Sequence, residues 1–221
     1  MITVGFHFDI MCPWAYQTSL WIRNVRDQID LDIDWRFFSL EEINRAEGKK
    51  HPWERDWSYG WSMLRVAALL RRNSMDDCDR FYAAAGHALH AEGRKPHKPE
   101  VAAELLEKIG LDPGLVAAAI ADSTTNDDVR ADHEAAVAHG SFGVPTLVFD
   151  DESYLYGPVI TPAPTGTAAR ALWDLVLATR QFPHLYEIKR PKTDRDMEHI
   201  AEQFTPYLAG RDWQSVERPA K

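Results

Sequence analysis

Hydrophobic and polar residues alternate in two short segments near the start of the chain, with a helical pattern between them. Residues 2–9 and 31–37 alternate between apolar and polar side chains, as the two faces of a β-strand do. From 14 to 29 the apolar residues recur at helical spacing, and Pro13 stands where the first turn of a helix accepts proline, because its missing amide proton has no partner there. Strand, helix and strand so close together predict a βαβ unit with parallel strands.

The rest of the chain changes from helical to mixed patterning. Helical spacing or alanine-rich composition dominates the middle, and strand patterns return only after Pro145. A polar turn at 150–153 lies between two short apolar segments, which predicts a hairpin. The predicted helices are 61–72, 78–92, 100–109, 113–121, 126–139, 167–180 and 196–208, and the later strands are 146–149 and 154–156. This order predicts an α/β fold into which a block of helices is inserted.

Composition narrows the class of protein. The 221 residues are 45% hydrophobic and 27% charged, which suits one folded core and excludes wholesale disorder. A net charge of −9 disfavours nucleic-acid binding. No apolar run approaches the length of a membrane span, and the strand pattern that starts at Met1 leaves no room for a secretory signal. We therefore expect a cytoplasmic protein with neither nucleic acid nor membrane as partner.

Cys12 is the residue at which chemistry is expected. It stands between the first strand and the first helix, so its sulfur should face free backbone amides and the positive end of the helix dipole. Both favour a thiolate, and we expect the pKa of Cys12 to lie at least about one unit below that of a free thiol. The alternative interpretation is a buried, inert cysteine.

Two other groups of residues have weaker claims to a function. His87 and His90 lie on one predicted helical face, but no third ligand has suitable spacing, so we expect no metal site. The aromatic run from Trp53 to Trp61 is either core packing or part of a pocket for a flat substrate next to Trp14.

Four sequence motifs carry a resemblance to a known family. Residues 8–15 (FDIMCPWA) resemble the active-site segment of thioredoxin-fold oxidoreductases of the DsbA-like superfamily. The similarity extends to 143–146 (GVPT), 156–159 (YGPV) and 172–190, and it is greatest to the actinobacterial mycothiol-dependent nitroreductase branch. The resemblance implies a thioredoxin-like fold with a large all-helical insertion. Its expected parts are residues 1–40 with 123–190, the insertion 41–122, and a charged C-terminal tail, 191–221.

The resemblance also implies the site. The Val144–Pro145 bond is expected to be cis and close to Cys12, on a strand antiparallel to the first strand. The expected catalytic residues are Cys12, Pro13 and Pro145, and the expected substrate-binding residues are Trp14, Ala15, Asn44, Val144 and Thr146.

One departure from the family pattern decides between mechanisms. Related redox enzymes have a second cysteine three positions after the first, where this chain has Ala15. Cys12 therefore has no neighbour with which to form an internal disulfide. Cys78, the only other cysteine, belongs to the predicted insertion, and we expect it to be structural.

The expected function is that of an oxidoreductase with one active thiol. Cys12 would exchange with a low-molecular-weight thiol such as mycothiol, as a co-substrate, and reduce disulfides or electrophiles, nitroaromatic compounds among them. No tightly bound cofactor is expected, and a homodimer is a further expectation. Two alternatives stay open. One is a thiol transferase or isomerase similar to the kappa-class glutathione transferases, in which Cys12 only orients a bound thiol. The other is a redox-inactive binding protein.

Overall fold

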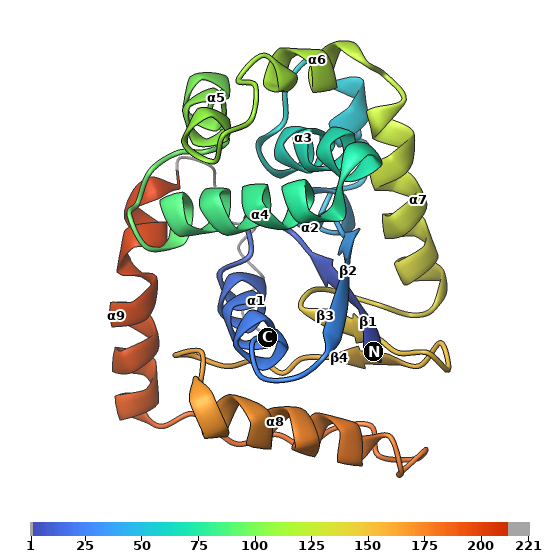
Figure 1. Cartoon of the computed structure of the whole chain (residues 1–221), viewed down its shortest axis with the longest axis vertical. Coiled ribbons are helices and arrows are strands. Elements are labelled where there is room, and N and C mark those ends of the chain that lie inside the picture. Colours follow the sequence, from blue (N-terminus) through green and yellow to red (C-terminus); the bar gives the residue numbers. More distant parts are fainter. Residues whose placement is uncertain (1, 212–221) are drawn as a thin grey trace.

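A four-stranded sheet in the order β2-β1-β3-β4 forms the centre of the computed structural model, which describes residues 2–211 (Figure 1). Strands β1 (Ile2–Phe8) and β2 (Leu31–Phe37) are parallel along their whole length. Strand β3 (Thr146–Val148) is antiparallel to β1, and β4 (Tyr154–Tyr156) completes a hairpin with β3. The βαβ unit, the hairpin and the antiparallel pairing of β3 with β1 are confirmed.

Every helix predicted from the sequence is present, with ends that differ by a few residues. The helices are α1 (Pro13–Arg26), α2 (Leu40–Ile43), α3 (Tyr59–Asn73), α4 (Met75–His90), α5 (Pro99–Lys108), α6 (Leu115–Ala121), α7 (Thr125–Ala138), α8 (Gly166–Thr179) and α9 (Asp194–Gly210). The sequence pattern missed α2 and a 3-10 turn at Pro52–Glu54, because both are too short to show a period. Helix α4 begins earlier than predicted, since the Ser74 hydroxyl accepts a hydrogen bond from the Asp77 amide and caps it.

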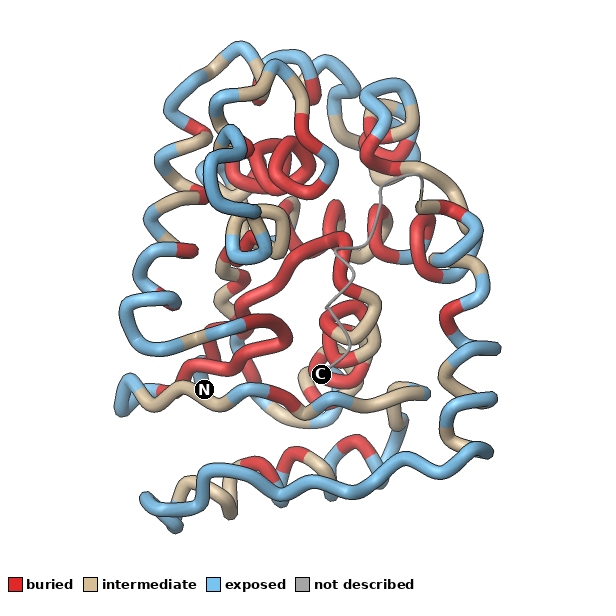
Figure 2. The backbone as a smooth tube through the Cα atoms, turned by 180° about the vertical axis from the view of Figure 1, so that it is seen from behind, coloured by how far each residue is buried: buried red, intermediate tan, exposed pale blue. Residues whose placement is uncertain are grey.

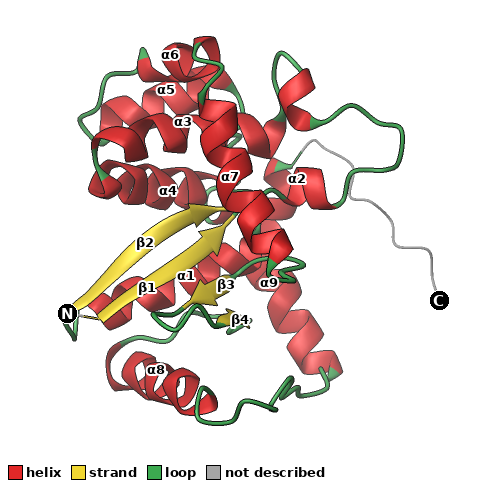
Figure 3. Cartoon of the chain, turned by 90° about the vertical axis from the view of Figure 1, so that its right-hand side faces the viewer, coloured by secondary structure: helices red, strands yellow, loops and turns green. Residues whose placement is uncertain are grey.

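The helical block lies at the end of the sheet towards which β1 and β2 point (Figure 3). Helix α8 lies at the opposite end, and α1 and α7 lie on opposite sides of the two parallel strands. Within the region expected to be a charged tail, 194–210 form α9 and 212–221 lie outside the described residues. None of the helices in residues 2–211 is both long and apolar enough to cross a membrane.

Strand β1 is buried on both faces, unlike a strand with one solvent-facing side. Every residue from Val4 to Phe8 is buried, the polar His7 included, and so is the following Asp9 (Figure 2). The sequence of β1 does alternate between apolar and polar residues. Helices cover the sheet on both sides, however, so the polar positions of β1 are buried as well.

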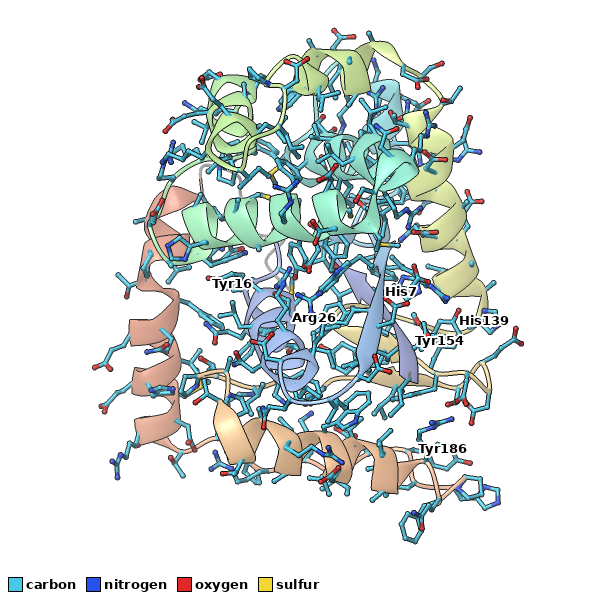
Figure 4. The ribbon with its side chains drawn as sticks, in the orientation of Figure 1. His7, Tyr16, Arg26, His139, Tyr154 and Tyr186 are labelled. Carbon is cyan, nitrogen blue, oxygen red and sulfur yellow. The ribbon has the colours of Figure 1, made fainter. Side chains whose placement is uncertain are left out.

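Helix α1, which carries Cys12 at its start, is held in place by contacts further along. Arg23 and Arg26 both donate to the buried carboxylate of Asp79 on α4, over 2.7 and 2.8 Å. Figure 4 shows Arg26 at this boundary between α1 and α4. On α8, the Ala169 carbonyl accepts a hydrogen bond from the Trp21 indole over 3.0 Å. A helix tied at several points presents its first turn in a fixed position.

Candidate active site

Cys12 is the N-cap residue of α1. Its backbone is extended, Pro13 occupies the first helical position, and the Ala15 amide donates to Cys12 Sγ over 3.4 Å. The Cys12 amide donates to the Asp9 carbonyl over 3.0 Å and closes the turn that links β1 to α1. This arrangement follows from the local sequence, since proline suits the first helical turn and a small polar side chain suits the cap.

The cysteine thiol lies against the Val144–Pro145 segment. Cys12 Sγ donates a weak hydrogen bond of 3.6 Å to the Val144 carbonyl, and the Val144–Pro145 peptide bond is cis. Thr146 begins β3 and donates through its hydroxyl to the Gly143 carbonyl over 2.8 Å. Pairing of β3 with β1 thus brings together two segments 132 residues apart, as the resemblance implied.

A small apolar cluster encloses Cys12. Ala15, Phe38, Ala136 and Val144 are its other buried members, and Trp14, Leu40 and Tyr154 pack against it. Cys12 is only 5% exposed as a result. In this closed arrangement the cluster leaves little of Cys12 open to solvent.

Burial sets the protonation of this thiol. It raises the pKa of Cys12 to about 12, and the nearby Asp9 carboxylate acts in the same direction, while the Ala15 and Trp14 amides lower it. The expectation of a lowered pKa is therefore wrong for the closed structure. The helix N-terminus supplies the amides, but loss of solvent outweighs them. Because burial is the main cause, admission of water or of polar reactant groups to Sγ will lower the pKa of Cys12.

We expect iodoacetamide to alkylate Cys12 slowly at neutral pH, with a rate that still rises above about pH 9 because the buried thiol stays protonated. The measurement is the alkylation rate against pH, with Cys12 identified by peptide mass spectrometry. A rate that reaches its plateau below about pH 8 would mean that the amides, and not burial, determine the protonation of the thiol.

Asp9 is a site residue that the sequence analysis missed. Its carboxylate is buried and accepts two amide hydrogen bonds, from Met11 over 2.9 Å and from Leu40 over 2.7 Å. Burial raises the pKa of Asp9 to about 7, and the two amide bonds oppose that shift. The side chain joins the loop before Cys12 to the start of α2. A signal was present, since Asp9 is the last polar residue of the alternation and stands three positions before Cys12.

Of the remaining expected site residues, Trp14 lies next to the cluster around Cys12 and Asn44 does not. Trp14 packs against the cluster around Cys12 and also meets Phe204 of α9 edge to face, with ring centres 4.7 Å apart. Asn44 is exposed at the end of α2, where its amide donates to the Leu40 carbonyl over 2.8 Å. That bond ties Asn44 to its own helix. Leu40, and not Asn44, packs against the cluster around Cys12.

Cys78 and the aromatic run belong to other parts of the molecule. Cys78 is completely buried in the main core, in a different apolar cluster from Cys12. Trp61 is also core, and its indole donates to Asn126 over 2.8 Å. Trp57 and Tyr59 instead line a cavity of about 380 Å³ next to the start of α5. Their pocket is thus built from the helical block and not from Trp14.

The two histidines considered as metal ligands are held in different ways. His87 is exposed, with Nδ1 3.4 Å from the Tyr16 hydroxyl, whereas His90 is buried and hydrogen-bonds to the Ile10 carbonyl over 2.8 Å. In residues 2–211, no three His, Cys, Asp or Glu side chains are grouped so that they would hold a metal ion.

Helix α9 is the second feature that the sequence analysis did not connect to the site. Besides the Phe204 contact with Trp14, Tyr207 packs against His90 with ring centres 5.2 Å apart. Burial raises the pKa of Tyr207, and the charges of Cys12 and Asp9 add to the shift, so this phenol lies near the active-site loop. The C-terminal helix therefore covers part of the thiol's surroundings.

The family model of the mycothiol-dependent nitroreductase Rv2466c matches residues 11–190 of this chain. A Mycobacterium tuberculosis protein named Uncharacterized protein Rv2286c is 57% identical over 218 residues, which cover 99% of this chain and 94% of that protein.

Solved structures show the same fold at low sequence identity. The probable DsbA oxidoreductase SCO1869 from Streptomyces coelicolor is 19% identical, with a TM-score of 0.60 over 87% of this chain and 96% of that chain. The cytosolic disulfide reductase DsbM from Pseudomonas aeruginosa with GSH is 18% identical, with a TM-score of 0.59 over 80% and 100%. A 2-hydroxychromene-2-carboxylate isomerase is 17% identical, with a TM-score of 0.60 over 84% and 100%. The fold is thus that of the DsbA-like thioredoxin-fold proteins.

Proposed function

Because the chain belongs to the family of the mycothiol-dependent nitroreductase Rv2466c and is thereby a thiol-dependent oxidoreductase, we propose that it works through Cys12 alone, in exchange with a mycothiol-type small thiol. The single observation that carries this proposal is the contact at the cap of α1. Where a second thiol would resolve the first, the Ala15 backbone amide donates to Cys12 Sγ. We place the reaction in the cytoplasm, where small thiols are kept reduced.

The exchange cycle balances with one protein thiol. The Cys12 thiolate attacks the mycothiol sulfur of a mixed disulfide between mycothiol and a substrate, which forms a Cys12–mycothiol disulfide and releases the substrate thiolate to take up a proton. A second mycothiol, as thiolate, attacks the mycothiol sulfur of that adduct and yields mycothiol disulfide and free Cys12. The net reaction converts the mixed disulfide and one mycothiol into the substrate thiol and mycothiol disulfide. For a nitroaromatic substrate, oxidation of two mycothiol molecules to mycothiol disulfide supplies the two electrons and two protons that give the nitroso compound and water.

The neighbouring residues have distinct roles in this proposal. Ala15 and Trp14 supply the amides that favour the thiolate once solvent or a reactant reaches the sulfur. Pro13 fixes the start of the helix that presents these amides. The Val144 carbonyl holds the resting thiol, and exchange requires that this weak contact break. Val144, Pro145 and Thr146 form the segment along which a reacting thiol compound is expected to lie.

We expect mycothiol disulfide to add one mycothiol to the protein and then stop, because no second thiol adjoins Cys12. Intact mass spectrometry without reductant measures the adduct, and peptide mapping locates it on Cys12. The Cys78→Ala variant should give the same adduct and Cys12→Ala none. A Cys12–Cys78 bridge in the unmodified protein would contradict the one-thiol mechanism.

The transferase or isomerase alternative is favoured by one observation. The closed structure raises the pKa of Cys12 to about 12, so the resting group is a protonated thiol that is able to donate a hydrogen bond to a bound thiolate. In that mechanism Cys12 orients a small thiol and never becomes covalently modified, as a serine would also do.

A further inference from the structure

Residues 38–40, which we call the wall segment, form part of the surroundings of Cys12. The wall segment links the end of β2 to the single turn of α2, at the place where β2 ends beside α7 (Figure 3). Phe38 is a completely buried member of the cluster around Cys12, and Leu40 packs against the same cluster. A helix of four residues is too short to be stable alone, so the position of the wall segment depends on bonds from elsewhere in the chain.

Two buried side chains accept hydrogen bonds from consecutive amides of the wall segment. The Ser39 amide donates to Nδ1 of His133 over 3.2 Å, and the Leu40 amide donates to Asp9 over 2.7 Å. His133 lies on α7 and is 5% exposed, and its ring meets the Phe38 ring with centres 4.7 Å apart. Asp9 belongs to the active-site loop. The wall segment is therefore held to α7 and to that loop by side chains 94 and 31 residues away in the sequence.

His133 lies on the side of α7 that closes the cluster around Cys12. Ala136, three residues further along α7, is a buried member of that cluster. Residues three apart lie on the same side of a helix. One side of α7 thus supplies a part of the cluster and also the acceptor that holds the wall segment.

The protonation state of His133 suits the role of an acceptor. Burial lowers the pKa of His133, although the negative charges of Glu42 and Glu134 oppose the shift. The ring is therefore neutral at pH 7, and a neutral imidazole has one nitrogen that accepts a hydrogen bond. In His133 that nitrogen is Nδ1, because the Ser39 amide donates to it.

The other parts of the cluster belong to regular structure. Ala15 lies on α1, which two arginines tie to Asp79 of α4, and Val144 lies close before β3, which pairs with β1. The wall segment consists of a loop and the start of one helical turn. Loops held by a few side-chain bonds open at a lower free energy than paired strands and long helices do. We therefore take the wall segment as the part of the cluster that moves.

We propose that His133 is a positioning residue for the reaction at Cys12. It holds the wall segment closed over the thiol, and release of that segment gives a reactant access to the sulfur. Asp9 holds the neighbouring amide of the same segment. The proposal concerns access to Cys12, so it goes beyond the thiol exchange proposed above and applies equally to the transferase or isomerase alternative.

The direct test compares the alkylation rates of the two cysteines with iodoacetamide at about pH 8, measured by peptide mass spectrometry. Cys78 is completely buried in the main core, so its alkylation reports global unfolding. His133→Leu removes the acceptor, and the ratio of the Cys12 rate to the Cys78 rate should rise at least about tenfold. His133→Asn keeps a side-chain oxygen near the position of Nδ1, and the ratio should stay within about threefold of the wild-type value.

Val129→Ala is the matched control for a loss of stability. Val129 lies four residues before His133 on α7 and is buried in the main core. Its truncation destabilises the protein without removing the acceptor, so the ratio of the two rates should not change. An equal rise for both cysteines in His133→Leu would overturn the proposal, because the effect would then be one of global stability. The same rise in His133→Asn as in His133→Leu would also overturn it, because the hydrogen bond would then have no part in the effect.

Hydrogen exchange in the wild-type protein is a second measurement, which does not depend on whether a variant folds. The amides of Ser39 and Leu40 should exchange with deuterium by local opening, at rates that low concentrations of denaturant leave unchanged, whereas the amides of the central strand β1 should exchange by global unfolding. In His133→Leu the Leu40 amide should exchange at least about tenfold faster, although Asp9 still accepts its bond, because both bonds hold one segment. Exchange of Ser39 and Leu40 by global unfolding alone would overturn the proposal. Iodoacetamide and deuterium report access without mycothiol, so both tests are independent of the proposed thiol exchange.

Discussion

Replacement of Cys12 by serine should lower mycothiol-dependent disulfide reduction by at least about 10³-fold, because a hydroxyl neither attacks sulfur nor forms the mixed disulfide. The loss should appear in kcat, because Cys12 is buried within its apolar cluster and contributes little to the initial binding of a ligand. The measurement is the rate of reduction of a mycothiol mixed disulfide, with intact mass as a second readout.

Cys78→Ala is the matched control. Cys78 packs in the main core, so its loss should affect stability more than turnover. If Cys12→Ser retains mycothiol-dependent turnover of an electrophile, the transferase or isomerase mechanism replaces thiol exchange. That outcome would also fit the high pKa of the resting Cys12 thiol.

Replacement of Ala15 by cysteine should convert the protein to a dithiol enzyme. Positions 12 and 15 are one helical turn apart, and the Ala15 amide already contacts Cys12 Sγ, so the two sulfurs come within disulfide reach. Under mild oxidation the variant should lose two hydrogens and form an internal bridge. Its mycothiol adduct should disappear, because the new thiol attacks Cys12 faster than a second mycothiol arrives.

Intact mass and the reduction of a peptide disulfide by a dithiol reductant report both effects of Ala15→Cys. Ala118→Cys places a third thiol on the exposed face of α6 and should keep the wild-type adduct on Cys12. A stable Cys12–mycothiol adduct in oxidised Ala15→Cys would show that the cluster around Cys12 prevents the bridge.

The sequence by itself determined the local structure of this protein. Apolar spacing predicted all four strands and the helices longer than one turn, because periodicity depends only on which face of an element is buried. The position of Cys12 at the start of α1 is equally local, since Pro13 specifies the first helical turn. The absence of a resolving cysteine at Ala15, which decides the proposed mechanism, is visible without any structure.

Only the tertiary structure decided the electrostatics of the site. The helix N-terminus that should lower the pKa of Cys12 is present, yet Phe38, Ala136 and Val144 arrive from distant segments and remove the solvent around the sulfur. Asp9 is polar in the sequence but buried in the fold for the same reason. Helix α9 was visible as a helical pattern, but its contacts with Trp14 and His90 were not. Desolvation depends on which remote residues cover a group, and a one-dimensional pattern does not contain that information.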